Sequence, residues 1–574
     1  MYVLKGDCKM YKGIAASDGI GIGSAVIIKE QSLAYTSYTP KSIEQELIRF
    51  KQAVSDFTEK TMAMAERIKN QIGQKESEIL EGQVLMISDP MVSSEIESSI
   101  KVGKCSEEAV STVCDTFIKM FLGIEDEMMK QRASDIGDIK TRLLKLLLGI
   151  EEVDISAVAP GTILIAKDLT PSMTAGIIKE NVVGIVTEVG GKTSHSAILA
   201  RALEIPAVLS VENITSLCKD GDELVIDGFE GTVIDNLTDT IKKEYSDKNE
   251  KYMKYKKELS TYIGKKTVTA DGIEVELFGN IGKPEDAIKV AECDGEGVGL
   301  FRTEFLFMDK LSIPSEEEQF EAYKKAVQAL KGGTVIIRTL DVGGDKEIPY
   351  LELEKEDNPF LGFRAIRVCL QKEDVFKPQL RALLRASAFG EIRIMVPMVT
   401  CVDEVRSVKK LVKKYMLELD SESISYNKDI KIGVMIETPA AVSIADLLAK
   451  ESDFFSIGTN DLTQYTMAVD RGNAKVAYLY SAYNPAVIRF IKHVIACGKK
   501  ASIPVGMCGE SAADKALIPL LISFGLDEFS VNPASILATR KVISEVNKEA
   551  ADKLAEKVMK LETEHEIAEL LNSY

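Results

Sequence analysis

The sequence predicts a multidomain α/β protein, in which an α/β domain carries an inserted all-helical domain and is followed by a (β/α)8 TIM-type barrel. Three observations lead to this prediction. The chain has 574 residues, more than the roughly 250–300 over which a single hydrophobic core keeps growing. The spacing of apolar residues becomes helical near residue 38 and strand-like again near residue 150. Strand-like and helical stretches then alternate through residues 267–574, as they do in such barrels.

The α/β domain is predicted from two separated stretches, residues 1–35 and 150–236. A glycine-punctuated strand pattern runs from Gly13 to Gly23, and an apolar run follows it. Strand signals resume in the second stretch at residues 161–166. The simplest assembly is therefore one domain that is interrupted by the residues between the two stretches.

The interrupting segment, residues 38–149, is predicted to be all-helical. Apolar residues such as Ile43, Leu47, Phe50 and Val54 recur at the spacing of one helix face. Residues 237–266 are rich in Lys, Glu and Tyr and show no strand pattern. This second segment is predicted to be a linker helix.

The last segment, residues 267–574, contains eight strand-like runs that alternate with helical stretches. These runs are Val275–Asn280, Val298–Phe301, Val335–Leu340, Ile392–Val396, Ile432–Ile436, Phe454–Ile457, Ile503–Met507 and Glu528–Val531. In a (β/α)8 barrel the chemistry gathers at the carboxyl ends of the strands. Polar residues follow nearly every run, which favours a catalytic barrel over a purely structural one.

Composition excludes several classes of protein. The formal net charge of −18 argues against a general nucleic-acid binder, because such proteins need a basic surface. The nine cysteines show no CxxC pair, so we expect reduced thiols and neither a disulfide framework nor a zinc site. No apolar run is long enough to span a bilayer, and the first residues lack a signal-peptide core. We therefore expect a cytoplasmic protein without direct membrane insertion.

One of the three histidines, His195, follows a buried-strand pattern and a pair of glycines. Thr193 or Ser194 is suited to cap the helix that is predicted to begin here. His195 is thus expected in the first helical turn, where free backbone N–H groups and the helix dipole favour an anion. A lone histidine is more often a capping or packing residue. The glycines and the flanking hydroxyl groups nevertheless favour a histidine that carries or receives a phosphoryl group.

Arginines and carboxylates are predicted to meet at the mouth of the barrel. Arg302, Arg338, Arg364 and Arg471 have the forked geometry that binds phosphate and carboxylate oxygens. Salt bridges among the same residues would explain one or two such pairs, but they explain a ring of them poorly. The sequence therefore predicts a site for a small, doubly anionic phosphorylated acid.

Three further residues at the strand ends are candidates for the site. Glu437 and Asp461 carry hard oxygen ligands that suit Mg²⁺, an ion that needs only one or two carboxylates plus substrate oxygens. Cys508 ends an apolar run, so it is either buried filler or a proton donor. His493 and His565 lie in helical contexts and are interpreted as structural or surface residues.

Long motifs spread over essentially the whole chain resemble the enzyme I family of the bacterial sugar phosphotransferase system, the phosphoenolpyruvate–protein phosphotransferases. The motifs are GGKTSHSAILAR at 190–201, GVGLFRTEFLFMD at 297–309, IIRTLDVGGDKEIPY at 336–350, NPFLGFRAIR at 358–367, FFSIGTNDLTQYTMAVDR at 454–471 and GMCGE at 506–510. The resemblance implies that phosphoenolpyruvate phosphorylates His195, which passes the group to a histidine of the small carrier HPr. The products would be pyruvate and phosphorylated HPr, in the first step of sugar uptake.

The resemblance also implies a role for each matching residue. Phosphoenolpyruvate would be bound by Arg302, Arg338, Asn460, Asp461 and Arg471. Mg²⁺ would be held by the carboxylates of Glu437 and Asp461. Cys508 would protonate the departing enolate to give pyruvate.

Family likeness further implies an architecture. The phosphohistidine α/β domain would swivel between the barrel and the carrier, the barrel would form a homodimer, and the helical insert would dock HPr. The family's usual histidine in the insert is replaced here, within Glu81-Gly82-Gln83. An acidic rim around apolar residues is predicted on the insert, by Glu76, Glu78, Glu81 and Asp89 near Leu80, Leu85, Met86 and Met91. An ordinary solvated helix face would explain this spacing equally well, and only the family resemblance favours docking.

Two other functions were weighed. Pyruvate phosphate dikinase and phosphoenolpyruvate synthase share these motifs but need an additional ATP-grasp domain of ~200 residues or more, and the insert has no Walker-type phosphate loop. A regulatory module would bind phosphoenolpyruvate without turnover. The intact set of His195, Cys508, Glu437 and Asp461 favours an enzyme.

Overall fold

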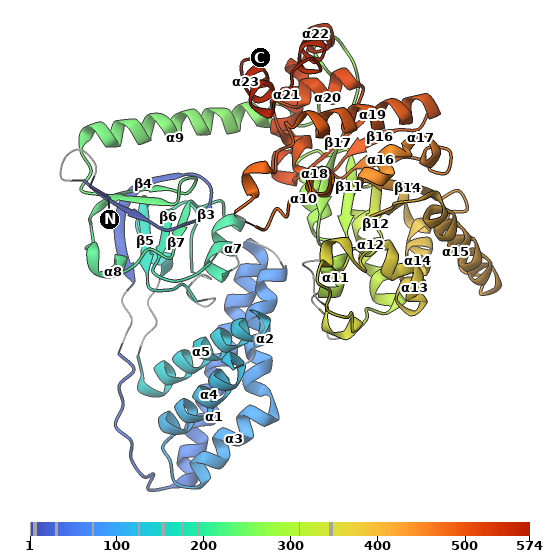
Figure 1. The fold of residues 1–574 in the computed structure, drawn as a ribbon. Coiled ribbons are helices and arrows are strands. Elements are labelled where there is room, and N and C mark those ends of the chain that lie inside the picture. Colours follow the sequence, from blue (N-terminus) through green and yellow to red (C-terminus); the bar gives the residue numbers. More distant parts are fainter. Residues whose placement is uncertain are drawn as a thin grey trace. The chain divides into compact units, whose positions relative to one another are not determined.

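In the computed structural model the chain forms two compact units, Met1–Tyr255 and Lys256–Tyr574 (Figure 1). The structure describes residues 2–3, 8–28, 32–71, 74–123, 127–150, 155–170, 173, 176–191, 194–308, 310, 312–343, 348–473 and 475–574. Within these ranges no helix is both long enough and apolar enough to cross a membrane.

The first unit contains a nine-stranded sheet in the order β1-β2-β9-β8-β4-β5-β6-β7-β3. Its strands are β1 (Tyr2–Val3), β2 (Lys9–Lys12), β3 (Ile14–Ser17), β4 (Ile20–Ile28), β5 (Thr162–Ala166), β6 (Val182–Thr187), β7 (Ala207–Leu209), β8 (Glu223–Asp227) and β9 (Thr232–Asp235). Strand β4 pairs in parallel with β5, although more than a hundred residues of chain separate them. Every residue of β5 is buried, as expected for an apolar run at the centre of a parallel sheet.

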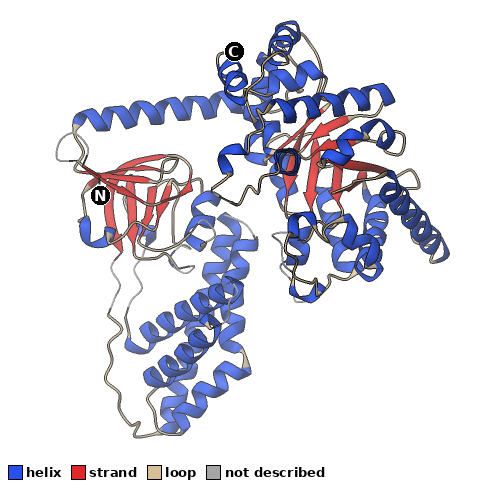
Figure 2. Cartoon of the chain, in the orientation of Figure 1, coloured by secondary structure: helices blue, strands red, loops and turns tan. Residues whose placement is uncertain are grey.

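Five long helices lie in the chain between β4 and β5 (Figure 2). They are α1 (Ile43–Gln71), α2 (Gln74–Ser88), α3 (Pro90–Lys101), α4 (Ser106–Leu122) and α5 (Glu127–Leu148). Their apolar faces meet in one core, which includes Phe50, Phe57, Ile96, Val110 and Leu143. The expectation that this stretch is helical is confirmed, and the helices begin and end within the expected segment.

Among the described residues, three further helices lie in the connections of the first unit. They are α7 (His195–Ala202), α8 (Ile214–Leu217) and α9 (Asp239–Ser260), and a short 3-10 turn covers Ile155–Ala157. The boundary between the two units falls inside α9, after Tyr255. The middle of α9 is fixed to the first unit, since Lys248 Nζ lies 2.6 Å from Asp227 Oδ2 and Tyr252 packs edge-on against Phe229. Near the end of α9, Glu258 pairs with Lys541 of the second unit at 2.9 Å.

The second unit is a closed barrel of eight parallel strands. They are β10 (Glu276–Ile281), β11 (Gly297–Arg302), β12 (Thr334–Arg338), β13 (Ile392–Val396), β14 (Lys431–Ile436), β15 (Phe455–Ile457), β16 (Val505–Met507) and β17 (Glu528–Val531). Each observed strand overlaps one of the eight predicted runs. Strand β17 pairs with β10 and closes the barrel, so the predicted fold class is confirmed.

Helices surround the barrel (Figure 1). They are α10 (Asp286–Glu292), α11 (Glu304–Met308), α12 (Glu316–Ala329), α13 (Ile366–Gln371), α14 (Glu373–Ala386), α15 (Val402–Ser421), α16 (Pro439–Ser443), α17 (Ala445–Leu448), α18 (Thr459–Met467), α19 (Pro485–Ala501), α20 (Ile518–Phe524), α21 (Ile536–Glu545), α22 (Lys548–Val558) and α23 (Glu564–Asn572). The barrel opens at the carboxyl ends of its strands, and the predicted site residues of this unit follow those ends.

Candidate functional site

His195 is the first residue of helix α7, directly after its N-cap. Ser194 is that cap, and its side chain accepts a hydrogen bond from the backbone N–H of Ala197 at 3.4 Å. Thr193, the other capping candidate, lies outside the described residues. The helix is anchored at its end by Arg201, which donates to the carbonyl of Ala16 at 3.0 Å. The predicted helix start is therefore confirmed, and it presents free backbone N–H groups that favour an anion.

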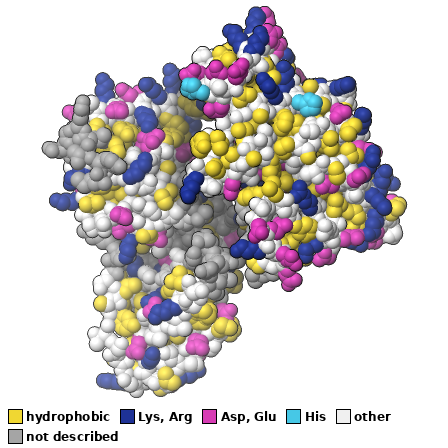
Figure 3. Space-filling model, in the orientation of Figure 1, with side chains coloured by type: hydrophobic (Ala, Val, Ile, Leu, Met, Phe, Trp, Pro, Cys, Tyr) yellow, Lys and Arg dark blue, Asp and Glu magenta, His cyan; other side chains and the backbone are white. Residues whose placement is uncertain are grey.

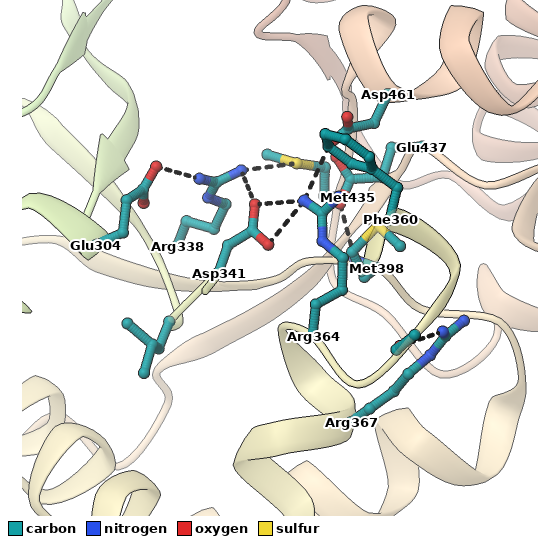
Figure 4. Close-up of polar contacts among 12 residues, drawn as sticks. Glu304, Arg338, Asp341, Phe360, Arg364, Arg367, Met398, Met435, Glu437 and Asp461 are labelled. Atoms are coloured by element: carbon teal, nitrogen blue, oxygen red, sulfur yellow. Dashed lines mark hydrogen bonds and ion pairs between the residues drawn. The ribbon is translucent and has the colours of Figure 1, made fainter. Parts of the chain in front are cut away.

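At the barrel mouth, two buried arginines share one carboxylate (Figure 4). Arg338 Nη1 lies 3.0 Å from Asp341 Oδ2, and its Nη2 donates to Glu304 at 2.7 Å. Arg364 Nη2 lies 3.0 Å from the other oxygen of Asp341. Burial alone would lower the pKa of Arg338, but Glu304 and Asp341 outweigh it and raise that pKa. Both guanidinium groups are therefore held positively charged inside the barrel.

These arginines keep donors that the protein does not use. The Nε atoms of Arg338 and Arg364 are buried and make no hydrogen bond within the described part of the chain. Leaving such a donor unpaired costs about 1–3 kcal/mol, and more for a charged group. Unpaired charged donors in a polar mouth are the arrangement expected of a site that binds an anion.

The two predicted metal ligands lie next to this cluster. Asp461 Oδ2 is 3.4 Å from Arg364 Nη2, whereas its buried Oδ1 has no hydrogen-bond partner among the described residues. Glu437 Oε1 accepts from the backbone N–H of Met398 at 2.7 Å. Burial, and then the negative charges of Asp461 and Asp341, raise the pKa of Glu437. Two crowded carboxylates with an unpaired oxygen are a donor set that fits Mg²⁺.

Metal-binding groups of other kinds are absent from the ranges that the structure describes. No group of three or more His, Cys, Asp or Glu side chains gathers there as a metal site would require.

Cys508 directly follows β16 and is buried inside the barrel. Burial raises the pKa of its thiol to about 12, so the thiol keeps its proton at neutral pH. Asn280, at the end of β10, donates to the carbonyl of Cys508 at 3.2 Å. Sequence reasoning did not single out Asn280, although a polar residue at the end of an apolar run was the available signal.

The remaining predicted residues are at the rim of the barrel. Arg302 ends β11, is exposed, and its guanidinium lies 5.0 Å from the ring centre of Phe305. Asn460 Oδ1 accepts from the backbone N–H of Glu510 at 3.3 Å. Tyr480 donates to the carbonyl of Asn460 at 3.2 Å, and the nearby charge of Arg471 opposes the rise that burial causes in the pKa of Tyr480.

The structure thus places His195 in one unit and the other predicted site residues at or after the carboxyl ends of the barrel strands in the other unit. These barrel residues are Arg302, Arg338, Arg364, Glu437, Asn460, Asp461, Arg471 and Cys508. Four further residues belong to the site, although no individual role was predicted for them: Glu304, Asp341, Tyr465 and Asn280. The first three lie within the motifs quoted above and contact the arginines, whereas Asn280 lies outside those motifs and contacts the carbonyl of Cys508. The remaining histidines, His493 and His565, are exposed, and histidine side chains are visible on the surface of the barrel unit in Figure 3.

Family models and relatives cover nearly the whole chain. The models described as "PEP-utilising enzyme, N-terminal", "mobile domain" and "PEP-binding domain" match residues 12–132, 158–231 and 256–548. A phosphoenolpyruvate-protein phosphotransferase of Staphylococcus carnosus (strain TM300) is 44% identical over 99% of this chain and 99% of its own length. One from Bacillus sp. (strain S) is 44% identical over 97% of each chain.

A solved structure described as the NMR solution structure of Enzyme I (nEIt) is 36% identical, with 42% of this chain and 99% of that chain covered and a TM-score of 0.39. The phosphotransferases of Staphylococcus carnosus and Bacillus sp. are 44% identical to this chain over 99% and 97% of its length. The chain therefore belongs to the phosphoenolpyruvate-protein phosphotransferase family, and it is a PEP-utilising transferase of the phosphotransferase system.

Proposed function

We propose that this chain transfers the phosphoryl group of phosphoenolpyruvate to His195 and then to a histidine of the carrier HPr, and releases pyruvate. This would be the first step of sugar uptake by the phosphotransferase system. In the first transfer, the bond between phosphorus and the enol oxygen breaks, and a bond to an imidazole nitrogen of His195 forms. The enolate left behind takes a proton on its methylene carbon. The observation that carries this proposal is the set of buried, unpaired arginine donors beside two carboxylates.

The barrel mouth would bind phosphoenolpyruvate through its positive charges. Arg302, Arg338 and Arg471 would contact the phosphate and carboxylate oxygens, and Asn460 would add a neutral donor. Phosphoryl transfer depends mostly on positioning and on neutralising charge. Because Arg338 is fixed by Glu304 and Asp341, its donors need no rearrangement when substrate arrives.

Glu437 and Asp461 would hold Mg²⁺. When bound, the ion supplies positive charge next to the phosphate and enolate oxygens. The protein's own part is to keep both carboxylates buried and close together, with Met398 orienting Glu437. Cys508 would then supply the proton to the enolate, because its buried thiol keeps a proton at neutral pH.

Motion between parts of the chain would join the two half-reactions. We propose a division into a phosphohistidine domain at 1–35 and 150–236, a carrier-binding insert at 38–149, a linker at 237–266 and a barrel at 267–574 that forms a homodimer. His195 has to reach phosphoenolpyruvate and later the carrier, so its domain has to move. The linker is suited to connect the moving domain to the barrel, because α9 is held by the sheet of the first unit on one side and by Lys541 of the second unit on the other.

An assay with labelled phosphoenolpyruvate tests the proposed function. With Mg²⁺ alone, about one phosphoryl group should enter each chain and about one pyruvate should leave. With HPr present, label should pass to the carrier and pyruvate should accumulate over many turnovers. Pyruvate release that neither labels the chain nor depends on HPr would contradict the proposal.

Removing one metal ligand should weaken the response to Mg²⁺. Glu437→Gln keeps an oxygen that can accept from Met398 but removes the charge, so we expect its half-saturating Mg²⁺ concentration to rise on the order of tenfold or more. Titrating pyruvate release against Mg²⁺ measures this. Glu510→Gln, at an exposed carboxylate of the same mouth, is the control and should respond like the native chain. An unchanged Mg²⁺ response in Glu437→Gln would remove Glu437 from the metal site.

For the carrier-binding surface, two of the predicted apolar residues, Leu80 and Met86, are not exposed, and Met86 packs partly buried against the helical core. Leu80 is fully buried, because its side of α2 packs against Ala65 and Ile68 of α1. Leu85 and Met91 are exposed, by 73% and 67%, and Glu78 and Asp89 are exposed beside them in the sequence. The side chain of Glu76 lies outside the described residues. The proposed docking surface is therefore Glu78, Glu81, Leu85, Asp89 and Met91.

The replaced histidine position does not belong to that surface. Gln83 is fully buried and donates to Asp138 Oδ2 at 3.1 Å. The replacement therefore affects the core of the insert and leaves the exposed face free to dock a basic partner with an apolar patch.

Reversing two charges on the docking surface should slow transfer to HPr. Glu78→Lys with Glu81→Lys removes electrostatic attraction for a basic carrier, and we expect a loss on the order of tenfold in the second-order rate at low salt. The loss should shrink at physiological ionic strength, where exposed charges are screened over ~8 Å. The measurement is label transfer at two salt concentrations. The control pair Glu549→Lys with Glu556→Lys makes the same change in net charge on α22 of the barrel unit. Equal losses in both pairs would place the docking surface elsewhere.

A further inference from the structure

The barrel interior holds a buried carboxyl group that the chemistry above does not use. Glu528 is the first residue of β17 and is 5% exposed. Its Oε1 makes no hydrogen bond within the described part of the chain. The barrel interior also holds an apolar cluster of Phe278, Leu300, Ile336, Met395, Met435, Phe454 and Cys508, whereas the charged residues that act on Glu528 are Glu276, Arg393 and Asp527. Burying an ionised carboxyl group in this place costs free energy, so the group is expected to be protonated or to take part in the reaction.

Two glycines make room for the carboxyl group. A Cβ atom on Gly299 of β11 would lie 2.2 Å from Glu528 Oε1, and one on Gly506 of β16 would lie 2.3 Å from Oε2. Both distances are far inside van der Waals contact, so a side chain at either position would displace the acid. The group is therefore held inside the barrel, between strands that both border the site.

Gly506 also places this acid one level below Cys508. The parallel register pairs Ser456 with Gly506, and Gly506 with Glu528, so these three residues share one level of the barrel. Cys508 comes two residues after Gly506, which puts its side chain on the same face about 6.6 Å further along. The strand pairing continues there, since the backbone N–H of Cys508 donates to Ile457 O at 3.1 Å.

A hydroxyl group lies on the other side of the bare glycine. Ser456 is fully buried, and its Oγ makes no hydrogen bond to the described residues. Its side chain lies beside the Cys508 thiol and opposes the rise in the pKa of that thiol. Gly506 puts no side chain between Ser456 and Glu528. The two groups are not hydrogen-bonded to each other, since Ser456 Oγ and Glu528 Oε1 both lack a partner among the described residues, so proton transfer between them requires the Glu528 side chain to turn toward the hydroxyl group.

Burial and the neighbouring charges keep the Glu528 carboxyl group protonated. Burial raises the pKa of Glu528 to about 8, Glu276 and Asp527 add to the rise, and Arg393 opposes it. The raised value means that the acid is protonated at neutral pH and loses its proton as the pH rises through about 8. A thiolate at Cys508 would be a stronger base than the carboxylate of Glu528. A proton would therefore move from the Glu528 carboxyl group to the Cys508 sulfur.

We propose that Glu528 is the proton reservoir that recharges Cys508 after each turnover, with the Ser456 hydroxyl as the bridge. This inference rests on the proposed role of Cys508 as proton donor. First the S–H bond of Cys508 breaks and a C–H bond forms on the enolate, giving pyruvate and a thiolate. Then the O–H bond of Glu528 breaks and the S–H bond re-forms, as the serine hydroxyl passes on one proton and receives another. Finally the Glu528 carboxylate takes a proton from solvent.

A comparison of the first turnover with later turnovers tests the relay on the full chain. Glu528→Gln keeps the shape of the side chain but cannot store an acidic proton. Rapid mixing with phosphoenolpyruvate and Mg²⁺ should give a native first burst of pyruvate, because Cys508 starts out protonated. With HPr present, the steady rate should fall about tenfold or more, within the range that proton transfer groups contribute. Glu274→Gln, at an exposed carboxylate that pairs with Lys266 just before β10, is the control and should be native in both phases.

Ser456→Ala gives a second test in which Glu528 is unchanged. Like Glu528→Gln, this variant should show a native first burst and a reduced steady rate. A native steady rate in Glu528→Gln would overturn the relay. If Glu528→Gln lowers both the rate of the first burst and the melting temperature, the relay would also be overturned, because Glu528 would then only support the fold. Cys508→Ser separates the two proposals: a native burst there would contradict the donor role of Cys508. A lost burst there, together with a native steady rate in Glu528→Gln, would overturn the relay alone.

Discussion

His195→Ala is expected to take up no label from phosphoenolpyruvate. The reason is that His195 stands at a helix start with free N–H groups, whereas the other two histidines are exposed on surface helices. A methyl group offers no nucleophile, so both the self-phosphorylation and the transfer to HPr should be lost completely. Acid-labile label, counted after separation of the chain, measures the result.

The two remaining histidines serve as controls for this prediction. His493 lies 3.6 Å from Cys497 Sγ, and His565 lies 3.2 Å from Glu569. His493→Ala and His565→Ala should both label like the native chain. Acid-labile label on His195→Ala, or its loss in either control, would contradict the assignment of His195 as the sole acceptor.

Cys508→Ser is expected to retain binding of phosphoenolpyruvate and to lose most of its turnover. The buried thiol is a weak acid already, since burial raises its pKa to about 12, and a serine hydroxyl is weaker still. We expect kcat to fall by about 10²–10⁴, the range that a positioned proton donor contributes. The affinity should change little, because the Arg338 cluster is untouched. Calorimetric binding together with steady-state pyruvate release separates the two effects.

Cys369→Ser makes the same chemical change at another buried cysteine of the barrel. Cys369 contacts the carbonyl of Leu340, which a serine hydroxyl can also reach, so turnover should stay near native. If Cys508→Ser turns over normally, Cys508 is a packing residue. If Cys369→Ser loses as much as Cys508→Ser, the loss reflects damage to the barrel core.

Strands of the barrel could be predicted because their burial is visible in the sequence. A parallel strand covered on both faces reads as a continuous apolar run, and the predicted run Ile392–Val396 coincides with β13. Ile503 was predicted in a strand but lies before β16, which begins at Val505. An apolar run continues wherever the chain is buried, whereas a strand ends where its hydrogen-bonded pairing ends.

The candidate site could be predicted in residue type but not in detail. Arg302 and Arg338 look alike in sequence, as each ends an apolar run. In the structure Arg302 is exposed at the rim, and Arg338 is buried between Glu304 and Asp341. Leu80 likewise resembled its exposed neighbour Leu85, but it is buried against α1.

By itself, the sequence determined the kinds of elements, their order and the chemistry of the side chains at the strand ends. These follow from local periodicity and from motifs within a few residues of one another. Only the tertiary structure decided that β4 pairs with β5 across the insert, and that Glu528 lies between Gly299 and Gly506. Such contacts join residues far apart in the chain, and a shift of one residue in strand register would turn each side chain to the opposite face.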